Sequence, residues 1–205
     1  SKGIPRKNLT TVGGIPLVER SIIVGLNAGC VSKVIVSTDD SEIMKLSKEA
    51  GAEVMERPEN ISGDIIMPDA AVLHVLNNIK DSGVQLPNVT CFVQPTSPFT
   101  SSDDIDSAYE KFCQTNCDSM FSGVSTHSFL WKEKAECEYV ESTNHDSSHR
   151  LGRQQLSPQF TETGAFYLFK TGEFLKIGHR FFGDIGVYEI PVQRAIDIDG
   201  FHDLE

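Results

Sequence analysis

The segment VTCFVQPTSPF, residues 89–99, sets the class of fold that this chain can adopt. Its first five residues, 89–93, form an apolar run, as expected for a central strand that is buried on both faces. Two prolines end the run, and Ser102, Asp103 and Asp104 are suited to cap a helix that follows. This part of the chain therefore predicts a strand, a loop and a helix, in that order.

The same alternation extends toward the N-terminus. Residues 17–26 carry apolar side chains at helical spacing, and residues 33–37 and 52–57 predict short strands. A further helix is expected over 67–82, where Pro68 suits the first turn. Alternating strands and helices imply an α/β fold with a mostly parallel, doubly wound sheet. Ligands of such sheets bind beyond the carboxyl ends of the strands.

The rhythm changes after residue 125, which divides the chain into three parts. Residues 1–125 predict the α/β core, and residues 126–160 are a polar excursion whose length indicates a role with a partner subunit or a substrate. Residues 161–205 return to the core, with strands expected in 164–169 and in RAIDID, residues 194–199.

Composition narrows the classes of function. The 205 residues carry a net charge of −11, which argues against a surface that coats nucleic acid. Five cysteines without a CxxC pair favour neither a disulfide framework nor a zinc site. Because the sequence contains neither an apolar run long enough to span a membrane nor the apolar core of a secretory signal, we expect a soluble, cytoplasmic protein without membrane contact.

The tripeptide Asp197-Ile198-Asp199 is the sharpest local signal for chemistry. In a strand both carboxylates would face the same side, where they repel each other unless a cation lies between them. A small set of oxygen ligands that waits for substrate phosphates describes a Mg²⁺ site. The alternative is a solvated strand edge, which the tripeptide taken alone favours.

The opening segment, SKGIPRKNL, is compatible with either a phosphate-binding loop or a solvated tail. Lys2 and Lys7 are suited to neutralise a polyphosphate, and Gly3 permits close approach of the backbone. The segment lacks the second glycine of a Walker A loop. Taken alone it reads more simply as a solvated tail.

Each of three further features is compatible with either of two roles, one in binding and one in structure. Gln94 ends the central strand and would either fix a substrate hydroxyl or satisfy backbone groups of the turn. Arg150 and Arg153 are suited to hold a carboxylate or to form a solvated basic stretch. The pair Phe181 and Phe182 is more often core than pocket wall.

Together these signals resemble a known family. The segments SKGIPRKNL, VIVSTDD, ERPE, FVQPTSPF, RQQLSPQF, TGAFYLF and AIDIDGFHDLE follow one another in the order and spacing of the acylneuraminate cytidylyltransferases. The resemblance covers essentially the whole chain. It implies a Rossmann-like nucleotidyltransferase fold and the transfer of CMP from CTP to an N-acylneuraminate-type nonulosonic acid, with release of pyrophosphate.

The resemblance also implies roles for particular residues. Asp197 and Asp199 would bind Mg²⁺ or Mn²⁺, and with Lys7 they form the expected catalytic set; one of the two carboxylates, or a metal-bound water, would accept the proton. The nucleotide contacts implied are Ser1, Lys2, Lys7, Asn8 and Arg57. The sugar contacts implied are Gln94, Arg153, Tyr167, Phe181 and Phe182, with the two phenylalanines forming an apolar wall for an N-acyl group.

In the family that it resembles, the excursion 126–160 is a dimerisation arm that reaches the active site of the partner. The resemblance therefore implies a homodimer in which Arg153 acts in trans. It also leads us to expect a strand before Ser1, because the family loop follows a strand and an Ala-Arg-x-Gly-like segment. Residues 65–68 depart from the small polar residues that the family usually has after the position of Arg57.

Two alternatives stay open. The first is the same chemistry on a related acid, such as legionaminic, pseudaminic or deaminated neuraminic acid. The second is a nucleotide-binding dimer without turnover. The retained carboxylates Asp197 and Asp199 argue against the second alternative.

Overall fold

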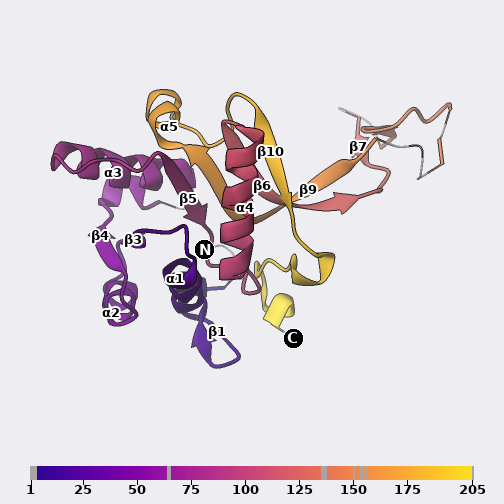
Figure 1. Ribbon diagram of the computed structural model, residues 1–205. Helices are drawn as coiled ribbons and strands as arrows, with labels where there is room; N and C mark the ends of the chain where they lie inside the picture. The colour runs from indigo at the N-terminus through magenta and orange to yellow at the C-terminus, as the bar shows by residue number, and fades with distance from the viewer. Residues whose placement is uncertain are drawn as a thin grey trace.

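The computed structural model of the chain describes residues 4–63, 66–134, 138–149, 151–152, 155 and 157–204. Its centre is a four-stranded sheet in the order β10-β6-β9-β5, flanked by helices and by a separate two-stranded sheet (Figure 1). The strands of the central sheet are β5 (Val89–Val93), β6 (Ser119–Thr126), β9 (Gln159–Lys170) and β10 (Ile185–Glu189).

Three of these four strands run in the same direction. β10 pairs parallel with β6, whereas β9 runs antiparallel to both β5 and β6. The separate sheet pairs β3 (Ile35–Thr38) in parallel with β4 (Glu53–Glu56). The prediction of an α/β fold with mostly parallel strands is confirmed, with β9 as the antiparallel member.

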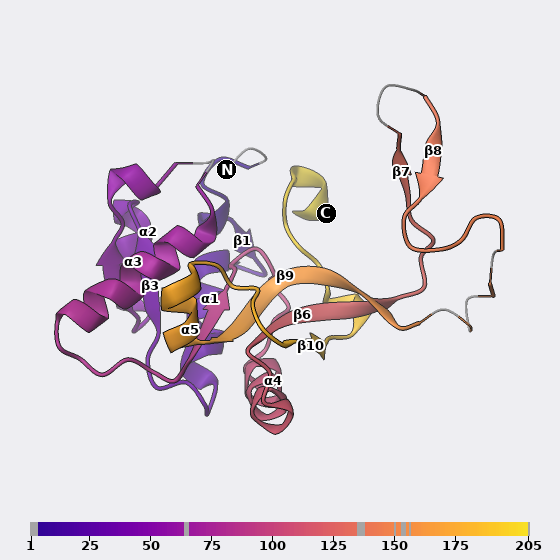
Figure 2. The ribbon, with the colours of Figure 1, turned by 90° about the horizontal axis from the view of Figure 1, so that it is seen from above.

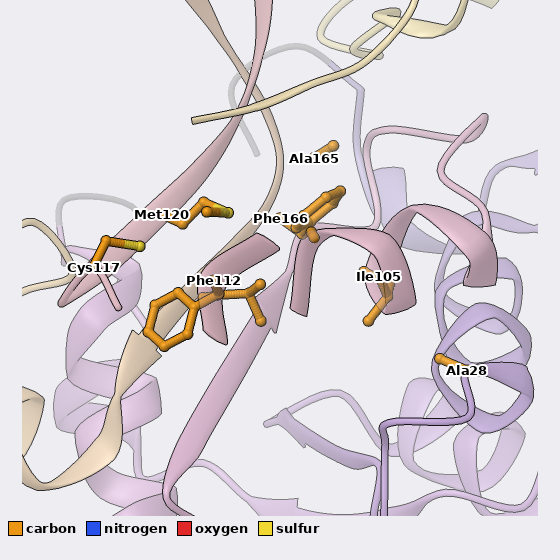
Figure 3. Close-up of a cluster of buried hydrophobic side chains, with 9 residues drawn as sticks. Ala28, Ile105, Phe112, Cys117, Met120, Ala165 and Phe166 are labelled. Atoms are coloured by element: carbon orange, nitrogen blue, oxygen red, sulfur yellow. The ribbon is translucent and has the colours of Figure 1, made fainter. Parts of the chain in front are cut away.

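Helices cover both faces of the central sheet, because its strands present apolar side chains alternately to either side. On one face, Phe166 and Leu168 of β9 pack with Ile105 and Phe112 of α4 (Ser102–Thr115), as Figure 3 shows for part of this cluster. On the other face, Tyr167 and Phe169 of β9 pack with α3 (Pro68–Asp81) and α5 (Thr171–Ile177), and Figure 2 shows α4 opposite these two helices. Each buried Phe or Leu contributes about 1.5–3 kcal/mol to folding.

The remaining helices belong to the N-terminal part. The helices α1 (Leu17–Asn27) and α2 (Ser41–Glu49) pack with β3 and β4 around a third cluster that includes Val18, Ile22 and Ile43. Asp40 caps α2, since its carboxylate accepts hydrogen bonds from the N–H groups of Glu42 and Ile43. The loop before α1 contains a 3₁₀ turn, η1 (Lys7–Leu9), and a small hairpin of β1 (Thr11–Val12) and β2 (Ile15–Pro16).

The segment between β6 and β9 carries a hairpin of β7 (Trp131–Glu133) and β8 (Val140–Ser142), which projects away from the central sheet (Figures 1 and 2). The ring of His145 lies edge-on to Trp131 at 5.0 Å between centroids and to Phe129 at 4.8 Å. These contacts give the excursion a small aromatic cluster. Its predicted role in dimerisation stays a prediction.

The structure differs from the sequence-based predictions in two places, the strand β6 and the segment 194–199. The strand β6 was not predicted, although it lies between β10 and β9 at the centre of the sheet. The strand predicted over RAIDID is wrong: Val192–Arg194 form a 3₁₀ turn, η4, and residues 195–199 have no regular structure. The reason is that Ile198 donates its N–H to the carbonyl of Thr96, in the loop after β5, rather than to a neighbouring strand.

The last element that the structure describes is a 3₁₀ turn, η5 (Phe201–Leu204), and a further turn, η2 (Glu59–Ile61), follows β4. Among the helices that the structure describes, none combines the length and the apolar character that crossing a membrane requires.

Candidate active site

A cavity of about 610 Å³ opens beyond the carboxyl ends of β5 and β6. Its position agrees with the rule for ligand sites in open α/β sheets. Four stretches of the chain line it: the loop after β5, the last residues of β6, residues 161–167 of β9 and the segment after β10. The lining residues are Gln94, Val124, Ser125, Thr126, Thr161, Glu162, Thr163, Gly164, Tyr167, Val192, Ala195 and Asp197.

Gly164 brings two predicted site residues together. Its φ of +75° is in the left-handed region, and a Cβ at this position would lie 3.0 Å from Oε1 of Gln94 and 3.9 Å from Oδ2 of Asp197. Only glycine therefore combines this backbone conformation with such close neighbours. Gln94 and Asp197, which are far apart in sequence, thus both lie beside Gly164 in the lining of the cavity.

Asp197 carries the clearest chemical signal of the site. Its Oδ1 is buried, and this oxygen has no hydrogen-bond partner. A buried carboxylate oxygen without a partner is costly, since it has lost its water without replacement. Such an oxygen fits a bound cation, and the two nearby carboxylates Asp197 and Asp199 are the oxygen donors that Mg²⁺ prefers.

Asp199 lies on the other side of Ile198 and has a different environment. Its side chain is 77% exposed, and its Oδ1 pairs with Nζ of Lys7 at 2.8 Å. Ile198 is buried with Ile4 and Leu17, which fixes the segment between the two carboxylates. The N–H groups of Asp199 and Gly200 both donate to the carboxylate of Asp203, which lowers the pKa of Asp203.

Asp197 and Asp199 are the carboxylates that the sequence predicts as metal ligands of this site. No group of three or more His, Cys, Asp or Glu arranged to hold a metal ion occurs among the residues that the structure describes. A closed site made entirely of such side chains is therefore not present in that part of the chain. Two carboxylates leave coordination positions for water and phosphate, as is usual for Mg²⁺ in nucleotide enzymes.

Tyr167 lines the cavity, and its hydroxyl and ring are both in contact with neighbouring side chains. Its hydroxyl donates a hydrogen bond to Oε1 of Glu162, and its ring stacks on Phe92 at 6.0 Å. Burial, together with the hydrogen bond to Glu162, raises the pKa of Tyr167, so that the phenol stays protonated. The guanidinium of Arg180 lies 4.5 Å from the centroid of the Tyr167 ring and pairs with the buried Asp69 at 3.1 Å.

The two predicted phenylalanines lie behind Tyr167 rather than in the lining of the cavity. Phe181 meets the ring of Tyr167 edge-on at 5.8 Å. Phe182 is 8% exposed and belongs to the core cluster of α3 and α5. The predicted wall for an N-acyl group stays a prediction.

The predicted nucleotide contacts lie in two places. Lys7 and Asn8 belong to η1, where Lys7 meets Asp199. Arg57 follows β4 and, with Asp39, lines a separate hollow of about 440 Å³. It donates hydrogen bonds to the carbonyl and hydroxyl oxygens of Ser37, and burial lowers its pKa. Three further predicted contacts, Ser1, Lys2 and Arg153, lie outside the described residues.

Sequence reasoning missed two polar residues of this region. Glu162 lines the cavity and accepts the hydrogen bond from Tyr167, but it stands in a strand with no pattern that singles it out. Ser97 has a buried hydroxyl oxygen without a partner, in the same loop as the Thr96 carbonyl that holds Ile198. The break of the apolar run at Gln94 was the one available signal, because it marks a polar loop at the end of a buried strand.

The chain is similar to known proteins in both sequence and structure. The profile described as "Cytidylyltransferase" matches residues 1–203. The pseudaminic acid cytidylyltransferase of Campylobacter jejuni is 30% identical over 100% of this chain and 89% of its own length. The N-acylneuraminate cytidylyltransferase A of Danio rerio is 32% identical over 97% of this chain but only 45% of its own length, so the chain spans about half of that relative.

Solved structures agree on the fold. A CMP:2-keto-3-deoxy-manno-octonic acid synthetase complexed with CTP superposes with a TM-score of 0.63, covering 93% of this chain and 85% of its own, at 11% identity. A 4-diphosphocytidyl-2C-methyl-D-erythritol synthase gives a TM-score of 0.70 over 97% of this chain and 91% of its own, also at 11% identity. The nucleotidyltransferase fold is thereby confirmed. Because the family profile spans almost the whole chain, this protein belongs to the cytidylyltransferase family.

Proposed function

We propose that this protein transfers CMP from CTP to the anomeric hydroxyl of an N-acylneuraminate-type nonulosonic acid and releases pyrophosphate. The relatives named for pseudaminic acid and for N-acylneuraminate support this class of acceptor. The observation that carries the proposal is the buried, unpaired Oδ1 of Asp197, a residue that lines a cavity at the carboxyl ends of the strands. A cavity of this kind is the expected place for a charged, multiply hydroxylated substrate.

In the proposed reaction the oxygen of the anomeric hydroxyl attacks the α-phosphorus of CTP. A new bond joins that oxygen to phosphorus, and the bond from the α-phosphorus to the bridging oxygen of the β-phosphate breaks. Pyrophosphate leaves with the bond electrons, and the hydroxyl proton passes to a carboxylate. Asp197 and Asp199 are the candidates for this acceptor, because Asp197 lines the cavity and Asp199 follows it two positions later in the sequence.

Asp197 and Asp199 would also hold Mg²⁺ or Mn²⁺. Such a cation would neutralise charge on the transferring phosphate and orient the leaving group. The unpaired oxygen of Asp197 and the exposed carboxylate of Asp199 fit this role.

The nucleotide side of the proposed site is basic. Lys7 would bind the triphosphate, assisted by Asn8 and by Ser1 and Lys2, and Arg57 would contact the nucleotide from the end of β4. Lys7 is suited to this task because its side chain is 13% exposed and its Nζ already faces the carboxylate region. A lysine acts on phosphate as a point charge without strict geometry.

The acceptor side of the proposed site is rich in hydroxyl and amide groups. Gln94 and Tyr167 would orient the sugar acid, and Phe181 and Phe182 would stand behind them toward an N-acyl group. Arg153 would bind the acid's carboxylate from a partner subunit, which makes a homodimer part of the proposal. A cytoplasmic site of action stays a prediction.

Pyrophosphate release tests the proposal directly. Purified protein is incubated with Mg²⁺ and CTP, and each of four acids is added in turn: N-acetylneuraminic, pseudaminic, legionaminic and deaminated neuraminic acid. We expect release that requires the metal and one preferred acid, with a CMP-sugar found by mass spectrometry. Reactions without acid and reactions with ATP in place of CTP are the controls. Binding of CTP without release for any acid would support a non-catalytic module instead.

A further inference from the structure

Arg194 lies on η4, directly before the segment that carries Asp197 and Asp199, and it ties this segment to α4. Its Nη2 donates to Oδ1 of Asp104 at 2.8 Å, and its Nη1 donates to Oδ2 of the same carboxylate. The Nη1 group also lies 3.4 Å from the hydroxyl of Ser101 and 3.5 Å from the carbonyl of Phe99. Two parallel hydrogen bonds fix the orientation of both planar groups, which a single contact does not.

The acceptor of these bonds is itself rigidly held. Asp104 is the third residue of α4 and forms a capping box with the N-cap residue Ser101, from whose N–H and hydroxyl it accepts hydrogen bonds at 2.9 and 2.7 Å. Its side chain is 5% exposed. Arg194 is therefore anchored to a buried, immobile point of the core rather than to a flexible surface group.

The segment that follows Arg194 is held at separate points rather than by a strand or helix. Residues 195–199 have no regular secondary structure, yet Ala195 and Asp197 line the cavity. Downstream, Ile198 is fixed by its N–H bond to Thr96 and by burial of its side chain. The ion pair of Arg194 and the anchor at Ile198 thus enclose Asp197 between two fixed points.

We propose that Arg194 is a positioning residue, which sets the place of the Asp197 carboxylate in the cavity and thereby the affinity of the site for a divalent cation. The proposal rests on the proposed function and deepens it. Arg194 touches neither substrate nor cation in this role. It acts through the backbone of residues 195–197, in the way that outer residues of metal sites orient the ligands.

The variants that test it are Arg194→Gln, Arg194→Lys and Asp104→Asn. The matched control is Lys170→Gln, because Lys170 pairs with Asp118 at 2.8 Å, has a similarly exposed side chain of 34% and lies at the far end of β9 from the cavity. Binding of Mn²⁺ in the presence of CTP is measured by electron paramagnetic resonance, without any sugar acid, well below the Tm of each variant.

We expect Arg194→Gln and Asp104→Asn to raise the Kd for Mn²⁺ about tenfold. Arg194→Lys should recover part of this loss, and Lys170→Gln should bind Mn²⁺ as the unchanged protein does. The Kd is compared among variants that remain folded, so Arg194→Lys decides the matter if the glutamine variant does not fold. A lower Tm with an unchanged Kd for Mn²⁺ would overturn the proposal and leave Arg194 a purely structural role.

Failure of the proposed function would look different. A protein that binds Mn²⁺ and CTP, with a Kd that depends on Arg194, but releases no pyrophosphate with any acid would retain the positioning role and lose the proposed acceptor. A protein that binds no Mn²⁺ in the presence of CTP would overturn the positioning proposal itself.

Discussion

Lys7 and Asp199 stand 192 positions apart and form an ion pair of 2.8 Å between Nζ and Oδ1. The lysine comes from the 3₁₀ turn near the N-terminus and the carboxylate from the irregular segment near the C-terminus. The turn that carries Lys7 and the segment that carries Asp199 are thus in contact, two residues from Asp197 of the cavity lining. In the proposed reaction these partners would separate, because a triphosphate would attract Lys7 and a divalent cation would attract Asp199.

Removal of the charge at Lys7 should weaken catalysis with CTP. We expect Lys7→Gln to lower kcat/KM for CTP about 10- to 100-fold, since a hydrogen bond to a charged group is worth roughly 1.5–3 kcal/mol. Steady-state release of pyrophosphate measures the effect. The control is Lys33→Gln, which removes an exposed ion pair with Glu53 and should leave kcat/KM unchanged. Equal kinetics for both variants would exclude Lys7 from the nucleotide site.

Removal of the carboxylate at Asp199 should separate activity from stability. Asp199→Ala is expected to reduce turnover by about 1,000-fold or more, because the charge that it would hold near the phosphate is lost. The Tm should change little, since the Asp199 side chain is 77% exposed. Pyrophosphate release and calorimetry on the same sample check both statements. Asp81→Ala, at the exposed end of α3, serves as control; unchanged turnover in Asp199→Ala would refute the metal assignment.

A methyl group at Gly164 should disturb the cavity wall. Gly164→Ala places a side chain in the left-handed region, which costs about 1–2 kcal/mol, and its Cβ would approach Oε1 of Gln94 to 3.0 Å. We expect a lower free energy of unfolding and a KM for the sugar acid raised about tenfold, a loss near 1.4 kcal/mol of binding. Denaturant unfolding and kinetics measure the two effects.

The control for Gly164 is another glycine of the same part of the chain. Gly172, in α5, has no positive φ, and a Cβ added there would meet no atom within 4 Å, so Gly172→Ala should be neutral or stabilising by up to about 1 kcal/mol. If both substitutions change the free energy of unfolding and the KM equally, a side chain at position 164 causes no strain.

The ion pair of Arg194 and Asp104 should make stability depend on pH in the acid range. Burial alone would raise the pKa of Asp104, but hydrogen bonds from Arg194 and Ser101 outweigh it and hold the pKa below its ordinary value. Because the pKa is lower in the folded than in the unfolded state, the stabilisation is present above a pH of about 3.9 and is lost as the pH falls through the folded value.

Arg194→Gln should therefore lower the Tm most near neutral pH, with a loss of about 1–3 kcal/mol, and the difference from the unchanged protein should narrow below a pH of about 4. Thermal unfolding followed by circular dichroism between pH 7 and pH 3 measures this difference. Lys33→Gln, which removes an exposed pair, should differ little at any pH. If the difference in Tm between Arg194→Gln and the unchanged protein stays constant down to pH 3, Asp104 is not the titrating partner.

Local patterns were enough to predict most of the regular elements. The apolar run 89–93 became β5 with the predicted bounds, and Pro68 begins α3 as expected. Both follow from interactions between neighbouring residues, namely backbone propensity, capping and the fixed φ of proline. The strand β6 escaped prediction because residues 119–126 mix small polar and apolar side chains without a period of two. The strand gains its stability from pairing with β9 and β10, which lie far along the chain.

For the candidate site, too, the sequence predicted some features and only the structure showed others. The types of chemical group were readable in the chain: two carboxylates around Ile198, a lysine-rich loop and a glutamine after a buried strand. Their arrangement was not, because the predicted strand over 194–199 is an irregular segment held by Arg194 and by Thr96. Short-range forces thus specify the helices, most strands and the candidate ligands. The meeting of Lys7 with Asp199 and of Gln94 with Asp197 depends on contacts between distant residues, which exist only after the whole chain has packed.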